Sequence, residues 1–214
     1  MVPRVLRRLN RSRRVKRLID VSVAGGGLLL SAPIVAALTA VVGLRHGWPP
    51  IFVQERPGQD GRLFRMYKLR TMTNERDAHG ELKPDTERLT ELGRFLRASS
   101  LDELPELLNV LRGEMSLVGP RPLLTEYLPR YSPRQRRRHD VPPGITGRAQ
   151  VEGRNALSWN EKFEHDVAYV DDWSNLEDLR ILVQTLRTVL LREGIAHEGQ
   201  ATMHKFMGNE AEHA

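Results

Sequence analysis

The feature that most constrains this chain is an apolar run near its N-terminus. From Val21 to Leu44 there are 24 residues without a charged side chain. At about 1.5 Å per residue, a helix of that length can reach across the roughly 30 Å hydrocarbon core of a bilayer. A polybasic segment beside an apolar run is typical of an anionic membrane face, and a signal peptide would have a shorter apolar region. We therefore predict a membrane-attached protein whose partners include anionic lipids, because eight basic residues precede the run: Arg4, Arg7, Arg8, Arg11, Arg13, Arg14, Lys16 and Arg17.

Two placements of this helix are compatible with the sequence. Hydropathy alone favours a single spanning helix. Pro33, however, lies in the middle of the run, where it removes a backbone donor and favours a kink. Arg45 and His46 make the far end basic as well, so the charge asymmetry that orients a spanning helix is weak. A re-entrant helix that bends at residues 31–33 accounts for both observations, with Ser31 satisfying backbone groups freed at the bend.

After residue 48 the chain becomes polar, so we divide it into residues 1–48, the basic arm and membrane helix, and residues 49–214, a globular domain. Alternating and Gly/Pro-punctuated patterns predict a short β-hairpin from strands 51–54 and 63–69, and a strand at 115–118. Apolar spacing predicts helices at 86–96, 101–111, 158–172 and 178–193. The fold class is therefore α+β and helix-dominated. In the last helix a stripe is expected to face the core: Leu179, Leu182, Val183, Leu186, Val189 and Leu190.

Residues 99–105 carry the most informative polar motif. Ser100 and Glu103 have the spacing of a capping box, in which each side chain binds the other residue's backbone N–H. Alternatively, Asp102 and Glu103 at a helix start provide two carboxylates that could hold a divalent cation and attack phosphorus, while the helix N-terminus attracts phosphates. The sequence allows both interpretations together.

Cationic residues that could complete a phosphate site lie on either side of this motif. Lys68 and Arg70 are two apart on a predicted strand and so should share a face. Arg97 precedes the acidic pair. Arg121 lies between two prolines, and a fixed guanidinium is well suited to bidentate phosphate binding. Together these cations and the acidic pair predict a pyrophosphate pocket.

The chain resembles the small monotopic phosphoglycosyl transferases of the bacterial sugar transferase family over essentially its full length. Several ordered motifs of this length are specific to that family. The matching stretches are residues 16–20, 54–58, 67–72, 100–105, 109–122, 143–147 and 150–155.

The resemblance implies a re-entrant membrane helix, amphipathic interfacial helices and a cytoplasmic catalytic domain at the bacterial inner membrane. It implies a ping-pong reaction in which Asp102 attacks the sugar-bearing phosphorus of a UDP-sugar, UMP leaves, and undecaprenyl phosphate takes the sugar phosphate. Glu103 matches the second acidic residue, and Mg²⁺ is the implied cofactor, held by Asp102 and Glu103. The family pattern places Pro33 at the hinge, with Ser31 one position early. The positions it matches to substrate or nucleotide contacts are Lys68, Arg97, Arg121, Arg154 and Asp166.

Residues 153–159, 163–167 and 198–208 are similar to bacillosaminyl-phosphate transferases. The expected donor sugar is therefore an N-acetylated amino sugar, and N,N′-diacetylbacillosamine is the first candidate. The alternative is the same chemistry with galactose or glucose phosphate. A homodimer is compatible with the sequence, which does not define the number of subunits.

Two other classes of protein are compatible with parts of the sequence. A non-enzymatic membrane adaptor would use the basic arm alone. A membrane-anchored nucleic-acid binder is permitted by the net charge of +6, but the chain has no recognisable recognition helix and aromatic residues make up only 6 % of it. We expect no nucleic-acid partner. The chain has no cysteine, which excludes thiolate catalysis and Cys-based metal sites.

Overall fold

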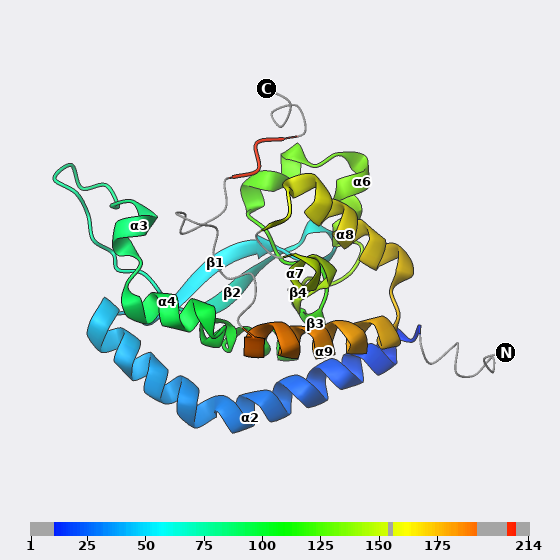
Figure 1. Cartoon of the computed structure of the whole chain (residues 1–214), viewed down its shortest axis with the longest axis horizontal. Helices are drawn as coiled ribbons and strands as arrows, with labels where there is room; N and C mark the ends of the chain where they lie inside the picture. The colour runs from blue at the N-terminus through cyan, green and yellow to red at the C-terminus, as the bar shows by residue number, and fades with distance from the viewer. Residues whose placement is uncertain (1–10, 154–155, 192–204, 209–214) are drawn as a thin grey trace.

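The computed structural model describes residues 11–153, 156–191 and 205–208. It is helix-dominated with two small sheets, in agreement with the predicted α+β fold class (Figure 1). In chain order the elements are α2 (Arg13–His46), β1 (Ile51–Pro57), η1 (Gln59–Gly61), β2 (Leu63–Leu69), α3 (Asp85–Arg88), α4 (Glu91–Ala98), η2 (Leu101–Glu103), α5 (Glu106–Arg112), β3 (Ser116–Val118), η3 (Thr125–Arg130), α6 (Pro133–Arg136), η4 (Arg137–His139), β4 (Gly144–Thr146), α7 (Arg148–Glu152), α8 (Trp159–Asp172) and α9 (Asn175–Leu191).

The apolar run forms one long helix, α2, which is the one helix in the described residues long and apolar enough to cross a membrane by length and composition. It starts after Ser12, whose side chain accepts a hydrogen bond from the Val15 N–H, and stays helical through Pro33. Figure 1 shows a bowed helix with both ends directed toward the rest of the protein. The Ser31 hydroxyl makes no hydrogen bond to any described residue, so the prediction that it satisfies backbone groups at the bend is wrong.

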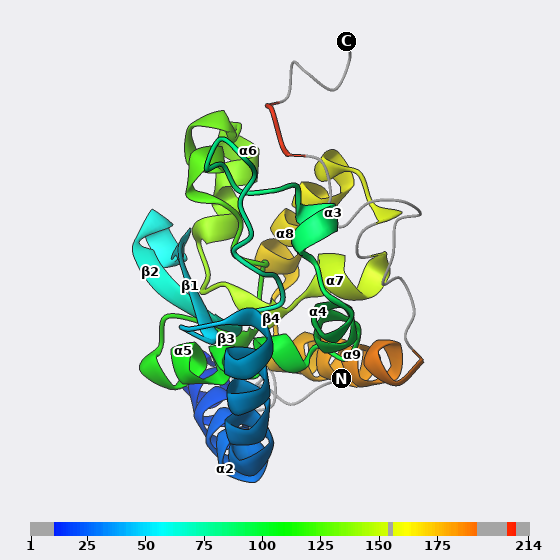
Figure 2. The same ribbon diagram turned by 90° about the vertical axis from the view of Figure 1, so that its left-hand side faces the viewer.

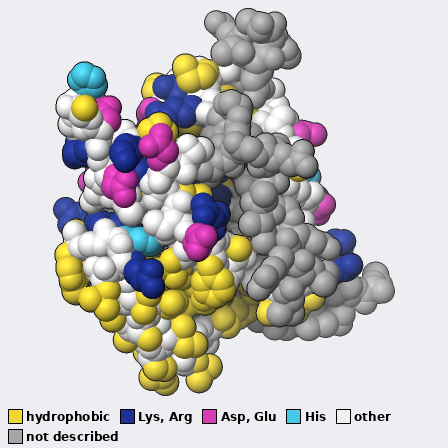
Figure 3. Space-filling view, turned by 60° about the vertical axis from the view of Figure 1, so that its left-hand side comes forward, with side chains coloured by type: hydrophobic (Ala, Val, Ile, Leu, Met, Phe, Trp, Pro, Cys, Tyr) yellow, Lys and Arg dark blue, Asp and Glu magenta, His cyan; other side chains and the backbone are white. Residues whose placement is uncertain are grey.

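Most of α2 is exposed. Its most exposed large side chains include Leu29, Leu30 and Leu44, at 78, 80 and 86 %. Figure 3 shows hydrophobic side chains gathered over α2 on the lower part of the molecule. Exposed apolar patches of this kind mark a surface that contacts lipid or another protein.

The N-terminal end of α2, in contrast, is fixed to the domain by polar contacts. Lys16 Nζ lies 2.7 Å from Asp178 Oδ2 of α9, and the Arg17 guanidinium donates to carbonyl oxygens in the last turn of α5. Asp20 is buried and accepts a hydrogen bond from the Leu117 N–H. Two of the basic residues expected to face anionic lipid therefore bind the protein itself.

The predicted hairpin is confirmed. Strands β1 and β2 pair antiparallel from Ile51 opposite Leu69 to Pro57 opposite Leu63. The predicted strand at 115–118 is also present as β3, which pairs in parallel with β4. Figure 2 shows the hairpin on one side of the domain above α5 and α2.

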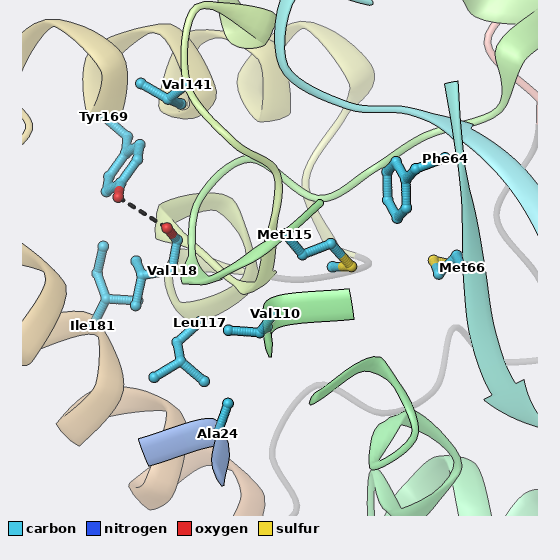
Figure 4. Packing of buried hydrophobic residues seen from close by; sticks show 10 residues of the cluster. All are labelled: Ala24, Phe64, Met66, Val110, Met115, Leu117, Val118, Val141, Tyr169 and Ile181. Atoms are coloured by element: carbon cyan, nitrogen blue, oxygen red, sulfur yellow. Dashed lines mark hydrogen bonds between the residues drawn. The ribbon is translucent and has the colours of Figure 1, made fainter. Parts of the chain in front are cut away.

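The main hydrophobic core joins these elements, including the first half of α2 (Figure 4). Helix α2 therefore contributes directly to the fold. It ends at His46, close to the domain boundary predicted at residue 48, and that boundary stays a prediction. The core residues drawn in Figure 4 are Ala24, Phe64, Met66, Val110, Met115, Leu117, Val118, Val141, Tyr169 and Ile181.

A second cluster is aromatic and includes the C-terminal Phe206, which is fully buried. Its ring packs edge-to-face on Phe163 at 4.9 Å and on Tyr127 at 5.7 Å between centroids. The C-terminal motif noted in the sequence thus packs against the domain at this residue; residues 192–204 of the chain lie outside the described part.

Two helix predictions were wrong in detail. The helix expected over 86–96 is two helices, α3 and α4, because the Thr90 side chain accepts a hydrogen bond from the Gly93 N–H and starts a new helix. The helix expected over 101–111 is the single turn η2 followed by α5, and Leu108 of α5 is 38 % exposed.

The predicted core stripe of the last helix is confirmed only in part: Leu182 packs against the main core, but other members of the stripe are exposed. Leu179, Val183 and Leu186 of α9 are 57–64 % exposed, whereas Asp178 and Ile181 are buried. Both ribbon views place α9 on the same side of the domain as α2 (Figures 1 and 2). Periodicity identified an apolar stripe without indicating what it contacts. The side chains of Val189 and Leu190 lie outside the described residues.

We expect Gly93→Ala to destabilise the protein. A Cβ at Gly93 would lie 1.8 Å from the Thr71 carbonyl oxygen, so α4 would have to move away from the end of the hairpin. Such overpacking costs about 1–3 kcal/mol, and thermal unfolding in detergent should show a fall in Tm of several degrees. Gly26→Ala is the control, because a Cβ there meets nothing within 4 Å. An unchanged Tm for Gly93→Ala would contradict this packing.

Candidate active site

The acidic pair lies on η2, a tight turn between α4 and α5. Ser100 precedes it in the left-handed conformation (φ 56°) and its side chain does not cap the turn. The capping-box interpretation is therefore wrong: Glu103 is not reaching back to the Ser100 backbone but binds cations. Asp102 is buried, at 7 % exposure.

Glu103 is the centre of an ion cluster. Its Oε1 lies 2.8 Å from Lys68 Nζ, which projects from β2, and it is also paired with the Arg121 guanidinium. Burial by itself would raise the pKa of Glu103, but Arg121 and Lys68 outweigh it and hold that pKa well below its ordinary value. Glu103 therefore stays ionised and ties η2 to β2 and to the loop after β3.

Asp102 differs from Glu103 although the two are adjacent. Its carboxylate makes no hydrogen bond or ion pair with any described residue. Burial, followed by repulsion from Glu103, raises the pKa of Asp102 to about 6, while Lys68, Arg121 and Arg97 act in the opposite direction. A carboxylate that is buried, unpaired and surrounded by cations is available for attack on an anionic phosphorus centre.

Arg97 approaches the same centre from α4. Its Nε donates to Thr71 Oγ1 at 3.1 Å, and burial lowers its pKa while the nearby Asp102 raises it. The structure therefore brings together five of the predicted residues: Asp102, Glu103, Lys68, Arg97 and Arg121.

Two other predicted residues, Arg70 and Asp166, do not join this cluster. Arg70 follows the last residue of β2, where the strand alternation ends, and its guanidinium lies 3.4 Å from the carbonyl oxygens of His46 and Gly47 at the end of α2. Asp166 is 3 % exposed and bound to Arg138, so it is not open to a nucleotide. Arg154 lies outside the described residues.

Asp166 nevertheless acts on the site through its partner. Arg138 Nη2 lies 2.7 Å from Asp166 Oδ2 and donates to the Arg121 carbonyl oxygen, also at 2.7 Å. The buried pair therefore fixes the backbone from which the Arg121 side chain projects. In the sequence, Arg138 lies among other basic residues, and nothing there indicated that its side chain would be buried.

Glu106 is a site residue that the sequence reasoning missed. It is 2 % exposed and its Oε1 lies 3.0 Å from Lys68 Nζ, so one ammonium group is shared by two carboxylates. Burial raises the pKa of Glu106 to about 7, against the opposing effect of Lys68. One signal in the sequence could have identified Glu106. It follows Asp102 by four residues, and in the helix expected over 101–111 these two side chains would share a face.

The donor set fits a magnesium ion only with substrate oxygens. Within the described residues no group of three or more His, Cys, Asp or Glu side chains could hold a metal. Glu103 Oε1 is already occupied by two cations, which leaves chiefly Asp102. Mg²⁺ is commonly held by one or two carboxylates together with substrate phosphates, so this arrangement suits a metal that arrives with a diphosphate.

Fold and site together combine an exposed apolar helix with a buried carboxylate inside a cluster of cations. Residues 11–192 match the family model described as bacterial sugar transferase, and the chain belongs to that family. The prediction of a sugar transferase enzyme is therefore confirmed.

Individual relatives agree with this assignment. The chain is 54 % identical to the uncharacterized sugar transferase EpsL of Bacillus subtilis (strain 168), over 91 % of this chain and 96 % of the relative. It is 38 % identical to the undecaprenyl-phosphate galactose phosphotransferase of Salmonella typhimurium (86 % of this chain, 42 % of the relative). It is 36 % identical to the UDP-N-acetylgalactosamine-undecaprenyl-phosphate N-acetylgalactosaminephosphotransferase of Aeromonas hydrophila (82 % and 44 %). The chain thus spans less than half the length of the last two relatives.

We expect Asp102→Asn to abolish activity while stabilising the protein. Because the folded-state pKa of Asp102 is raised, its ionised form costs stability at neutral pH, and removing that charge should return about 1–3 kcal/mol. Thermal unfolding should show a rise in Tm of a few degrees, together with at least a 1,000-fold loss of turnover.

The matched control is Asp60→Asn, an exposed aspartate in the hairpin turn whose left-handed backbone (φ 55°) asparagine also tolerates. A fall in Tm for Asp102→Asn, or substantial residual turnover, would argue against Asp102 as an unpaired buried nucleophile.

The rate of the first chemical step should depend on the ionisation of Asp102. With a pKa of about 6, the carboxylate is protonated and unreactive at pH 5 and ionised at pH 7, so the single-turnover rate should rise through a midpoint near 6. Glu106→Gln should keep that midpoint, which separates Asp102 from the neighbouring carboxyl whose pKa is about 7. A flat profile between pH 5 and 8 would contradict the assignment.

Proposed function

We propose that this protein transfers a sugar-1-phosphate from a UDP-sugar to undecaprenyl phosphate and releases UMP. The observation that carries the proposal is the unpaired, buried Asp102 carboxylate beside Lys68, Arg97 and Arg121. Relatives named as acting on undecaprenyl phosphate support the choice of acceptor.

In the first step an Asp102 oxygen forms a bond to the phosphorus that carries the sugar. The bond from this phosphorus to the bridging oxygen breaks, and UMP leaves with that oxygen. A phosphosugar ester of Asp102 remains. No proton is added or removed in this step, so the site needs an ionised carboxylate and cations rather than a general base.

In the second step an oxygen of undecaprenyl phosphate bonds to the same phosphorus, and the bond to Asp102 breaks. The sugar–oxygen bond is intact throughout, so the anomeric configuration is retained. Lys68, Arg97 and Arg121 bind the phosphate oxygens in both steps and stabilise the charge that accumulates on them. Glu103 holds Lys68 and Arg121 in place.

Magnesium is the proposed cofactor. It would be held chiefly by Asp102 together with the substrate phosphates, because Glu103 Oε1 is already paired with Lys68 and Arg121. When bound, it neutralises phosphate charge and stabilises the leaving group.

The lipid acceptor explains the position of α2. A bowed apolar helix with both ends toward the domain supports a re-entrant placement at the cytoplasmic face of the inner membrane (Figure 1). The exposed leucine and valine side chains of α9 lie on the same side of the domain and would rest in the interface, as amphipathic helices do. This arrangement would bring a membrane-borne phosphate to the site without crossing the bilayer.

The donor is proposed to be an N-acetylated amino sugar linked to UDP. The Aeromonas relative is named for N-acetylgalactosamine and the Salmonella relative for galactose, so both sugars belong among the candidates. N,N′-diacetylbacillosamine stays a prediction within the amino-sugar class, and galactose or glucose is the alternative donor sugar.

The test is UMP release by the detergent-purified chain with magnesium, undecaprenyl phosphate and a panel of UDP-sugars. The expected result is release with one donor sugar and none from Asp102→Asn. Without acceptor, one equivalent of UMP at most should appear, and labelled sugar phosphate should stay on the protein. Folded protein that releases no UMP with any donor would refute the proposal; release that strictly requires the acceptor would refute the covalent step alone.

A further inference from the structure

Arg56 belongs to the hairpin and to the matching stretch 54–58, but the reaction described above gives it no role. In the β1–β2 register it lies opposite Phe64, and Gln54 lies opposite Met66. Phe64 and Met66 are core residues, and paired residues of an antiparallel ladder point to the same face. Arg56 therefore projects inward, on the face that also carries Lys68.

Arg56 lacks a counter-ion among the described residues. Its Nη2 donates to Gln54 Oε1 at 2.6 Å, and its Nε is buried without a hydrogen-bond partner. Burial and then the charge of Arg121 lower the pKa of Arg56 to about 10, with Glu106 acting in the opposite direction, so the guanidinium is still protonated at neutral pH. Two neighbouring cations, one of them unpaired, form a site that an anion would stabilise.

The position of this pair relative to Asp102 indicates which anion it binds. The cations that affect the pKa of Asp102 are Lys68, Arg121 and Arg97. The pKa of Arg56 is lowered first by burial, and among charged groups Arg121 affects it most. Arg121 is thus common to both groups. Phe52 is the residue of β1 opposite Lys68, and Arg56 lies four residues further along the same strand. At strand spacing this separates Arg56 from Phe52 by about 13 Å. Arg56 extends the cationic surface away from the nucleophile.

We propose that Arg56 and Arg121 together bind the phosphate of the departing nucleotide, while Lys68 and Arg97 hold the phosphate that is transferred. This assignment rests on the proposed function. The attacked phosphorus must lie at Asp102, so the adjacent phosphate of the diphosphate extends past Arg121 toward Arg56. A planar guanidinium with a free Nε can donate two parallel hydrogen bonds to phosphate oxygens, which a lysine cannot reproduce.

The experiment compares Arg56→Gln, Arg56→Lys and the control Arg65→Gln in the full chain. Arg65 is an exposed arginine of the same hairpin that points to the opposite face. UMP is titrated into each protein by calorimetry in the presence of magnesium, and the KM for undecaprenyl phosphate and the Tm are measured. Arg56→Gln should weaken UMP binding about 10- to 100-fold, the loss of a charge-assisted contact. The KM for undecaprenyl phosphate should rise as well, because the acceptor phosphate attacks from the side that UMP leaves.

Arg56→Lys should keep part of the affinity, and Arg65→Gln should resemble the wild type. Unchanged UMP affinity in a folded Arg56→Gln protein would overturn the proposal. So would a loss of affinity that is as large in Arg56→Lys and is accompanied by a fall in Tm in both variants, which indicates a structural role. If Arg56→Gln does not fold, Arg56→Lys decides by the same readouts. UMP binding is measured without turnover, so the two proposals can fail separately. A wild-type protein that binds UMP through Arg56 but transfers no sugar phosphate would refute the proposed reaction, but not the proposal that Arg56 binds the nucleotide phosphate.

Discussion

The pairing of Glu103 with Lys68 and Arg121 is the interaction on which the rest of the site depends. Each partner comes from a different segment: η2, β2 and the loop after β3. Because Glu103 satisfies these cations, the adjacent Asp102 is buried without an ion pair to any described residue and is less acidic than usual. The surroundings thus give two neighbouring carboxylates different properties: one is held ionised by its ion pairs, and the other is the proposed nucleophile.

The membrane helix and the catalytic centre are parts of one structure. Lys16 and Arg17 fix the base of α2 to α9 and α5, and Ala24 enters the main core. α5 in turn follows directly on η2. The position of the nucleophile relative to α2 is therefore fixed by core packing rather than by a flexible linker, which suits an enzyme whose acceptor is proposed to be a lipid.

Local signals in the sequence predicted much of the secondary structure and the identity of the charged residues at the site. They failed where a side chain had more than one available partner. Ser100 and Glu103 have the spacing of a capping box, yet two cations distant in sequence outcompete a backbone N–H for Glu103. Arg70 was expected to share a strand face with Lys68, but β2 ends at Leu69, between the two residues. Glu106, Arg138 and Arg56 were missed because burial of a charged residue has no local signature.

By itself, the sequence determined that the chain has a helix long and apolar enough to cross a membrane, and it identified an acidic pair and several cations as the candidate site. Length, hydropathy and residue chemistry are properties of the chain. Only the tertiary structure decided which carboxylate is free, which arginines meet it and which face of α9 is exposed. Those outcomes depend on long-range contacts between segments far apart in sequence, and on the different desolvation of each charge once these segments pack.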